Sequence, residues 1–95
     1  MSRVRVEVIG AVQGVGFRWF AREVARRLDL AGWVRNRDDG SVEITVEGED
    51  SAVERFLAQV ERGPRGARVD ELRRHPLREV ADAKAPLGHP FEILR

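Results

Sequence analysis

The sequence lacks cysteine altogether among its 95 residues. Disulfide bonds, thiolate nucleophiles and sulfur-ligated metal sites are therefore excluded. The two histidines, His75 and His89, have no partners at the spacing of a metal site or a catalytic pair, so we expect them to be structural or exposed. Neither a metal nor another cofactor is expected.

Long apolar runs and an excess of charge of one sign are also missing. No apolar segment approaches the length of a signal peptide or a membrane span, so we expect a cytoplasmic protein that does not bind membranes. Seventeen basic and sixteen acidic residues leave a formal net charge of +1, which does not favour binding to a polyanion. The length predicts a single domain over residues 1–95, with one hydrophobic core and one site.

The first half of the sequence predicts a strand, a helix and a hairpin. Apolar and charged residues alternate over Arg3–Ile9, which is typical of a strand with one exposed face. Apolar residues then recur at spacings of three and four between Phe17 and Leu28, as in an amphipathic helix. Two short extended runs, Gly32–Arg37 and Ser41–Gly48, flank a turn-forming cluster and predict a β-hairpin.

The second half predicts another helix followed by extended segments. Ser51 and Glu54 match a capping box, and an apolar stripe follows until Gly63 and Pro64 end the helix. The remaining segments are predicted to be an extended stretch, a loop and a last strand, over Ala67–Leu77, Ala81–Gly88 and Phe91–Leu94.

This order of elements predicts an α+β fold of the ferredoxin-like (βαββαβ) type. Two helices would cover one face of a largely antiparallel sheet with an extra C-terminal strand. The right-handed crossover through the first helix makes the first two strands parallel, so their C-terminal ends lie at one edge of the sheet. The glycine-rich loop after the first strand and Asn36 near the end of the second are therefore expected to meet there.

Three glycines and an arginine mark the junction of the first strand and the first helix. Gly10, Gly14 and Gly16 let the loop direct successive N–H groups to one point, and the helix N-terminus adds unpaired N–H groups and its positive dipole end. Arg18 adds a permanently charged, planar fork. Neither the Walker pattern nor GxGxxG is present, which argues against nucleotides and leaves phosphate as the predicted ligand.

Asn36 has two interpretations. Hydrolysis needs a water held in line with the bond to be broken, and a neutral amide can hold one through its donors and its acceptor. Alternatively, Asn36 only opens the turn formed by Asp38, Asp39 and Gly40. Without further information, the sequence around Asn36 favours the interpretation in which this residue only opens the turn.

The sequence resembles the acylphosphatase family through two ungapped motifs in the right order. The family pattern GxVQGVGFR stands here as GAVQGVGFR over Gly10–Arg18, and GWVxN stands as GWVRN over Gly32–Asn36. A PxGAxV pattern over Pro64–Val69 and the segment Phe91–Ile93 also resemble the family. The resemblance therefore covers essentially the whole chain.

The resemblance implies an enzyme, an acylphosphatase, that hydrolyses a small acyl phosphate to carboxylate and inorganic phosphate without metal, cofactor or covalent intermediate. It also implies that Arg18 is the catalytic arginine that binds the phosphate, and that Asn36 orients the attacking water. No general base stands in the motifs, which fits proton transfer to the substrate phosphate itself. We expect a monomer, with inorganic phosphate as product or inhibitor. The phosphate cradle implied by the family consists of Gln13, Gly14, Val15, Gly16, Phe17 and Arg18.

Two departures from the family pattern lie beside the motifs without touching Arg18 or Asn36. Ala11 stands where many members have a basic residue, and Arg37 stands where a small hydroxyl residue is common. Trp19 lies opposite the apolar stripe of its helix, either as a partly exposed packing residue or as a contact for the acyl group.

Two other functions are weaker alternatives. Ferredoxin-like sheets also bind RNA, but they use stacking aromatic residues, and the central strand sequence SVEITVEG has none, so no nucleic-acid partner is expected. A non-catalytic module that binds phosphate or carbamoyl phosphate is the remaining alternative, since acylphosphatase-like domains also occur inside larger proteins.

Overall fold

Five strands and two helices make up the described part of the chain, which in this computed structural model comprises residues 1–76 and 90–94. The predicted loop Ala81–Gly88 and His89 lie outside the described residues. In chain order the elements are β1 (Ser2–Ala11), α1 (Phe17–Arg27), β2 (Ala31–Asn36), β3 (Val42–Gly48), α2 (Asp50–Arg62), β4 (Arg68–Pro76) and β5 (Glu92–Ile93).

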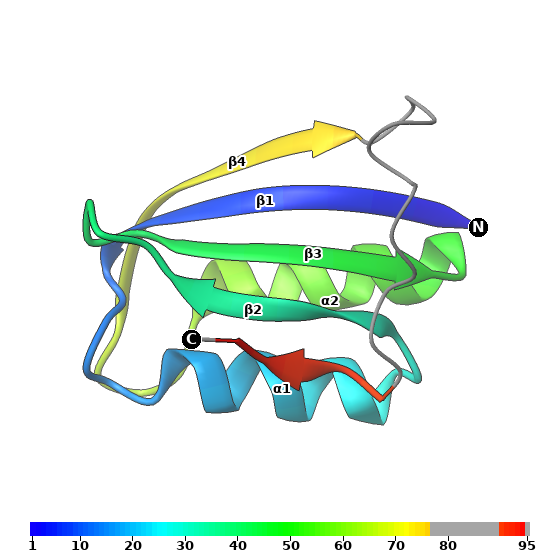
Figure 1. The fold of residues 1–95 in the computed structure, drawn as a ribbon, viewed down its shortest axis with the longest axis horizontal. Helices are drawn as coiled ribbons and strands as arrows, with labels where there is room; N and C mark the ends of the chain where they lie inside the picture. Colours follow the sequence, from blue (N-terminus) through cyan, green and yellow to red (C-terminus); the bar gives the residue numbers. More distant parts are fainter. Residues whose placement is uncertain (77–89, 95) are drawn as a thin grey trace.

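The strands form one sheet in the order β4-β1-β3-β2-β5, and both helices cover the same face of it (Figure 1). β3 pairs antiparallel with both β1 and β2, and β4 pairs antiparallel with β1. β1 and β2 therefore run parallel to each other on either side of β3. The short strand β5 extends the sheet by pairing parallel with β2. The predicted ferredoxin-like sandwich with an extra C-terminal strand is confirmed.

The core lies between the sheet and the two helices. One face of each strand is apolar because side chains alternate between the two faces of a sheet. The buried strand residues are Val4, Val6, Val8, Val34, Val42, Ile44 and Val46. The helices bury one stripe each, with Phe17, Ala21, Val24 and Ala25 on α1 and Val53, Phe56, Leu57 and Val60 on α2. The predicted alternation and helical periodicity are confirmed.

Arginine and glutamate side chains pair across the strands on the face of the sheet that the helices leave open. The Glu43 side chain on β3 is only 6% exposed, and its carboxylate lies 2.7 Å from Nε of Arg35 and 3.6 Å from Nη1 of Arg5. Arg3 and Glu47 form a similar pair at 2.9 Å. Buried carboxylates are costly unless paired, and these arginines, which come from both neighbouring strands, supply the partners.

The capping box predicted at Ser51 and Glu54 is wrong. α2 already begins at Asp50 after Glu49, so Ser51 lies within the first turn, and the helix has no side-chain cap hydrogen bond. Asp50 places a carboxylate near the positive end of the helix dipole, which favours an earlier start. The carboxylate of Glu54 pairs instead with Arg74 on β4, at 2.7 Å.

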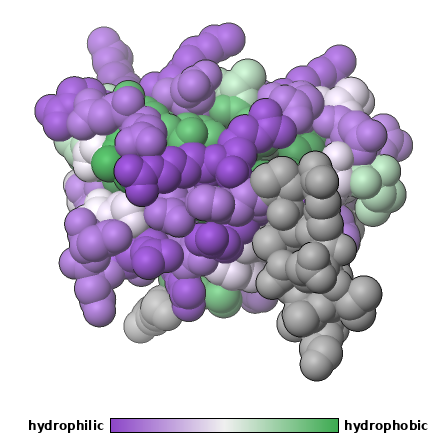
Figure 2. Space-filling view, turned by 90° about the horizontal axis from the view of Figure 1, so that it is seen from above, coloured by the Kyte–Doolittle hydropathy of each residue, from purple (hydrophilic) through white to green (hydrophobic). Residues whose placement is uncertain are grey.

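The face of the molecule beyond β4 is mainly hydrophilic. Figure 2 views the molecule from above Figure 1, where β4 is the outermost strand, and shows a hydrophobic strip among hydrophilic side chains. A shallow hollow of about 190 Å³ between α2 and β4 has both kinds of lining residue, namely Glu54, Leu57, Ala58, Glu61, Leu72 and Arg74. Neither helix is long and apolar enough to cross a membrane.

Phe91 fixes β5 to the rest of the fold. Its side chain is fully buried, and its ring centre lies 6.0 Å from that of Phe56 on α2. Nε of Arg26 on α1 donates a hydrogen bond of 3.0 Å to the Phe91 carbonyl oxygen. Three residues further on, the N–H of Leu94 donates to the carbonyl oxygen of Val34 at 2.8 Å. Packing of the Phe91 ring and these two hydrogen bonds together hold β5 beside β2.

We expect Phe91→Ala to lower the free energy of unfolding by about 3–5 kcal/mol, because it removes a fully buried ring and leaves a cavity. Urea unfolding followed by circular dichroism measures this loss. Phe91→Leu is the matched control and should lose clearly less, since it retains most of the apolar volume. A loss below about 1 kcal/mol for Phe91→Ala would contradict this anchoring role.

Candidate active site

The chain leaves β1 at Ala11 and turns through residues 12–16 into α1. Gly14 and Gly16 both have φ of 76°, and Gly16 is the N-cap of the helix. A Cβ at either position would meet no atom within 4 Å, so it is the left-handed backbone conformation, rather than crowding, that favours glycine. The first turn of α1 has no acidic residue and no side-chain cap, which leaves its N–H groups and positive dipole end available to an anion.

This loop borders a cavity of about 670 Å³. Its walls come from four parts of the fold: the end of β1 and the following loop, the first turn of α1, the end of β2, and β5. The lining residues are Val12, Gly14, Gly16, Phe17, Arg18, Trp19, Asn36 and Ile93. The structure thus brings Arg18 and Asn36 to one cavity, at the edge where the parallel strands β1 and β2 both end.

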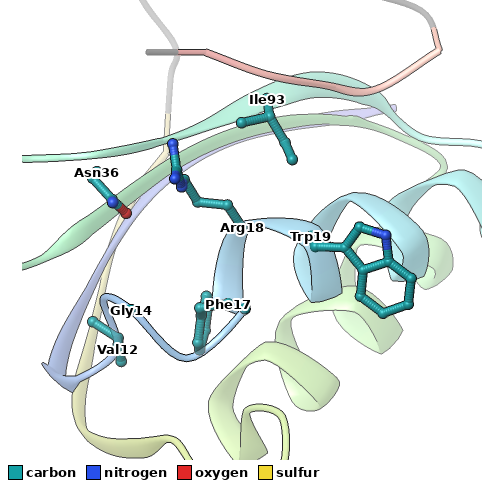
Figure 3. A pocket seen from close by; sticks show the side chains of 8 residues that line it. Val12, Gly14, Phe17, Arg18, Trp19, Asn36 and Ile93 are labelled. Carbon is teal, nitrogen blue, oxygen red and sulfur yellow. The ribbon is translucent and has the colours of Figure 1, made fainter.

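Arg18 extends from the first turn of α1 into this cavity. Figure 3 shows its guanidinium between the side chains of Asn36 and Ile93. Within the described ranges it makes no hydrogen bond and no ion pair, whereas the arginines of the open sheet face are paired with carboxylates. No carboxylate is among the described residues that line the cavity. The cavity therefore holds a permanent positive charge that has no protein counter-ion in the described part of the chain.

Asn36 is the last residue of β2, and its side chain points toward Arg18 (Figure 3). Its amide makes no hydrogen bond to another described residue. The turn that follows is stabilised by Asp39, whose carboxylate accepts hydrogen bonds from the hydroxyl of Ser41 at 2.6 Å and from its N–H at 2.9 Å. These bonds lower the pKa of Asp39. Because Asp39 supplies the side-chain bonds of the turn, the Asn36 amide is available to a ligand.

Gln13 and Val15 belong to the predicted phosphate cradle but do not line the cavity. The side-chain amide of Gln13 instead donates to the carbonyl oxygens of Arg37 and Ser41, at 2.7 and 2.8 Å. Val15 is partly buried against the hydrophobic core. Phe17 lines the cavity, yet its side chain is 2% exposed and packs in the core. For these residues, the groups available to an anion are those of the backbone.

Sequence reasoning missed two lining residues, Val12 and Ile93. Ile93 reaches the cavity because β5 pairs with β2, where it is aligned with Val34. The only sequence signal was the extended pattern of the last segment, which does not specify its neighbour in the sheet. Trp19 lines the cavity with a side chain that is 58% exposed, and its indole points away from Arg18 and Asn36 (Figure 3).

The arrangement is chemically suited to an anion. Residues 1–76 and 90–94 contain no group of three or more histidine or acidic side chains that could hold a metal ion. His75 instead lies on β4 with Nε2 3.3 Å from the carboxylate of Glu7. The cavity offers one guanidinium, the backbone of a glycine loop, the N-terminus of a helix and one neutral amide. This set can bind a phosphate group and hold a water beside it.

Comparisons with known proteins show which family the sequence matches. The Acylphosphatase family model matches residues 4–93. An acylphosphatase of Salinibacter ruber is 54% identical over 71 residues, which is 75% of each chain. One of Nitratidesulfovibrio vulgaris is 43% identical over 93 residues, covering 98% of this chain and 90% of the relative.

Solved structures agree with these sequence matches. The crystal structure of acylphosphatase from Bacillus subtilis matches over 100% of both chains, with a TM-score of 0.89 and 39% identity. The chain also matches full-length HypF, crystallised in a phosphate- and nucleotide-bound form, with a TM-score of 0.80 and 26% identity. That match covers 99% of this chain but 12% of HypF.

Proposed function

The chain belongs to the acylphosphatase family and is an enzyme of that class, and we propose that Arg18 and Asn36 are its catalytic residues. The proposed reaction is metal-independent hydrolysis of the carboxyl-phosphate bond of a small acyl phosphate. The observation that carries this proposal is the placement of a guanidinium and an amide, neither with a partner among the described residues, in one cavity beside the glycine loop. The proposed enzyme is a monomer with a single domain over residues 1–95.

The phosphate group of the substrate binds at the loop of residues 13–18. Backbone N–H groups of the loop and of the first turn of α1 donate to its oxygens, as at other helix N-termini. The Arg18 guanidinium donates two parallel hydrogen bonds to the same group, and such charge-assisted bonds contribute about 1.5–3 kcal/mol each. These contacts orient the phosphorus with the acyl oxygen directed away from the loop.

Asn36 holds the attacking water through its amide oxygen and orients it in line with the bond to be broken. The water oxygen forms a bond to phosphorus while the bond between phosphorus and the acyl oxygen breaks. The leaving carboxylate takes that bonding pair. The water proton passes to an oxygen of the transferred phosphate, since the lining residues within 1–76 and 90–94 include no side chain suited to act as a base. The products are carboxylate and inorganic phosphate, and phosphate rebinds the same groups as an inhibitor.

Release of phosphate from benzoyl phosphate in the presence of EDTA tests this function. We expect hydrolysis well above the rate in buffer, and no loss of rate as the EDTA concentration rises. The alternative is a non-catalytic module that binds phosphate or carbamoyl phosphate. Saturable binding of inorganic phosphate without any phosphate release would support that module and overturn the proposed hydrolysis.

Arg18→Lys should weaken binding of inorganic phosphate, because an ammonium cannot reproduce the two parallel bonds of a guanidinium. We expect the inhibition constant for phosphate to rise roughly tenfold or more, which corresponds to about 1.4 kcal/mol. Stability should change by no more than about 0.5 kcal/mol, since Arg18 has no partner in the described residues. Arg55→Lys, an exposed change on α2, is the matched control. An unchanged inhibition constant for Arg18→Lys would remove Arg18 from the phosphate site.

Asn36→Ala should lower kcat about a hundredfold or more while the fold is retained, comparable to the loss of a positioned polar group in other enzymes. The measurement is steady-state hydrolysis of benzoyl phosphate, with circular dichroism as the check of folding. Asn36→Asp keeps the size of the side chain but replaces its donors with a charge that repels phosphate, so it should also be impaired. Near-normal turnover of Asn36→Ala would return this residue to a turn-forming role.

A further inference from the structure

Gln13 connects the loop that precedes α1 to the hairpin formed by β2 and β3. Its side-chain nitrogen Nε2 lies 2.7 Å from the carbonyl oxygen of Arg37 and 2.8 Å from that of Ser41. An amide nitrogen carries two hydrogens, so each carbonyl oxygen receives one, and the donor capacity of the side chain is fully used. Both acceptors are backbone atoms whose positions define the end of the hairpin.

The two acceptors lie at the point where the hairpin closes. The N–H of Arg37 donates to the carbonyl oxygen of Ser41 at 2.9 Å, which is the last backbone bond before the turn. Arg37 directly follows Asn36, so a bond to the carbonyl of Arg37 acts one residue from the catalytic amide. Gln13 therefore forms hydrogen bonds to the backbone on both sides of the turn, next to the end of β2 where Asn36 lies.

No sheet ladder joins these two parts of the site. β3 lies between β1 and β2, so the loop after β1 and the end of β2 have no shared pair of strands. Among residues 1–76 and 90–94, the two Gln13 bonds are the only hydrogen bonds between loop residues 12–16 and hairpin residues 36–41. Without them, the distance between Arg18 and Asn36 depends on the indirect connection through β3 and on packing.

We propose that Gln13 is a positioning residue that sets Asn36 relative to the phosphate held by Arg18 and the loop. This inference rests on the proposed function, because it assigns Gln13 an effect that acts through Asn36. A misplacement of about 1 Å can cost a factor of about a hundred in rate. Gln13 is exposed and water can replace part of its bonding, so we expect a loss of about tenfold in kcat.

The test is a double-mutant cycle with Gln13→Met, which keeps the length of the side chain but removes both donors. In the wild-type background kcat for benzoyl phosphate should fall about tenfold, and in the Asn36→Ala background it should fall less than about twofold. The inhibition constant for inorganic phosphate should stay within about twofold, because Arg18 and the loop N–H groups remain. Gln59→Met on α2, a residue that does not line the cavity, is the matched control and should leave kcat unchanged.

Two results would overturn the role of Gln13. One is an unchanged kcat for Gln13→Met, and the other is an equal loss in both backgrounds, which would show an effect independent of Asn36. Gln13→Glu serves as a second variant if Gln13→Met does not fold, because an ionised carboxylate has the same shape without a donor and should also lose kcat. Normal turnover of Asn36→Ala would instead overturn the proposed role of Asn36 and this inference with it. Absence of phosphate release by the wild-type protein would overturn the proposed hydrolysis, so the failures are distinguishable.

Discussion

The position of β3 between β1 and β2 is the constraint on which both the core and the site depend. Because β3 pairs antiparallel with each neighbour, β1 and β2 must point in the same direction. Their ends then meet at one edge, where β1 continues into the glycine loop and β2 ends with Asn36. The same strand buries Val42, Ile44 and Val46 against the helices. A single strand thus contributes to the apolar core on one face of the sheet. By pairing with β1 and β2, it also brings the two catalytic candidates to one edge.

The charged side chains are distributed unevenly over this framework. On the open sheet face, the buried carboxylate of Glu43 is balanced by Arg5 and Arg35, so cations and anions occur there in pairs. In the cavity, Arg18 has no such partner within the described ranges, and no acidic residue is present in the lining. A chain with a net charge of only +1 therefore presents a local positive site. The net charge of the chain does not indicate the electrostatic field in one cavity, because most positive and negative charges elsewhere are paired with each other.

The sequence predicts those parts of the fold that depend on periodicity and on chain direction. Alternation predicts β1 and β3, helical spacing predicts α1, and the crossover rule predicts that Asn36 meets the glycine loop. The start of α2 was predicted wrongly, because Ser51 and Glu54 fit a local pattern while Asp50 begins the helix and Glu54 pairs with β4. The link from Gln13 to the hairpin and the neighbour of β5 depend on tertiary contacts between distant segments, which carry no local pattern.

The parallel pairing of β5 with β2 also bears on how the site forms. Ile93 aligns with Val34, so one wall of the cavity is contributed by a segment about sixty residues later in the chain. Contacts of high sequence separation form late, because the entropy of closing the intervening loop is lost before they are made. The two polar groups of the cavity can approach each other once β3 is in place, but the cavity has its fourth wall only after Phe91 docks. A chain in which β5 has not yet docked would carry both groups in an open groove, so the complete cavity forms only when this distant segment pairs with β2.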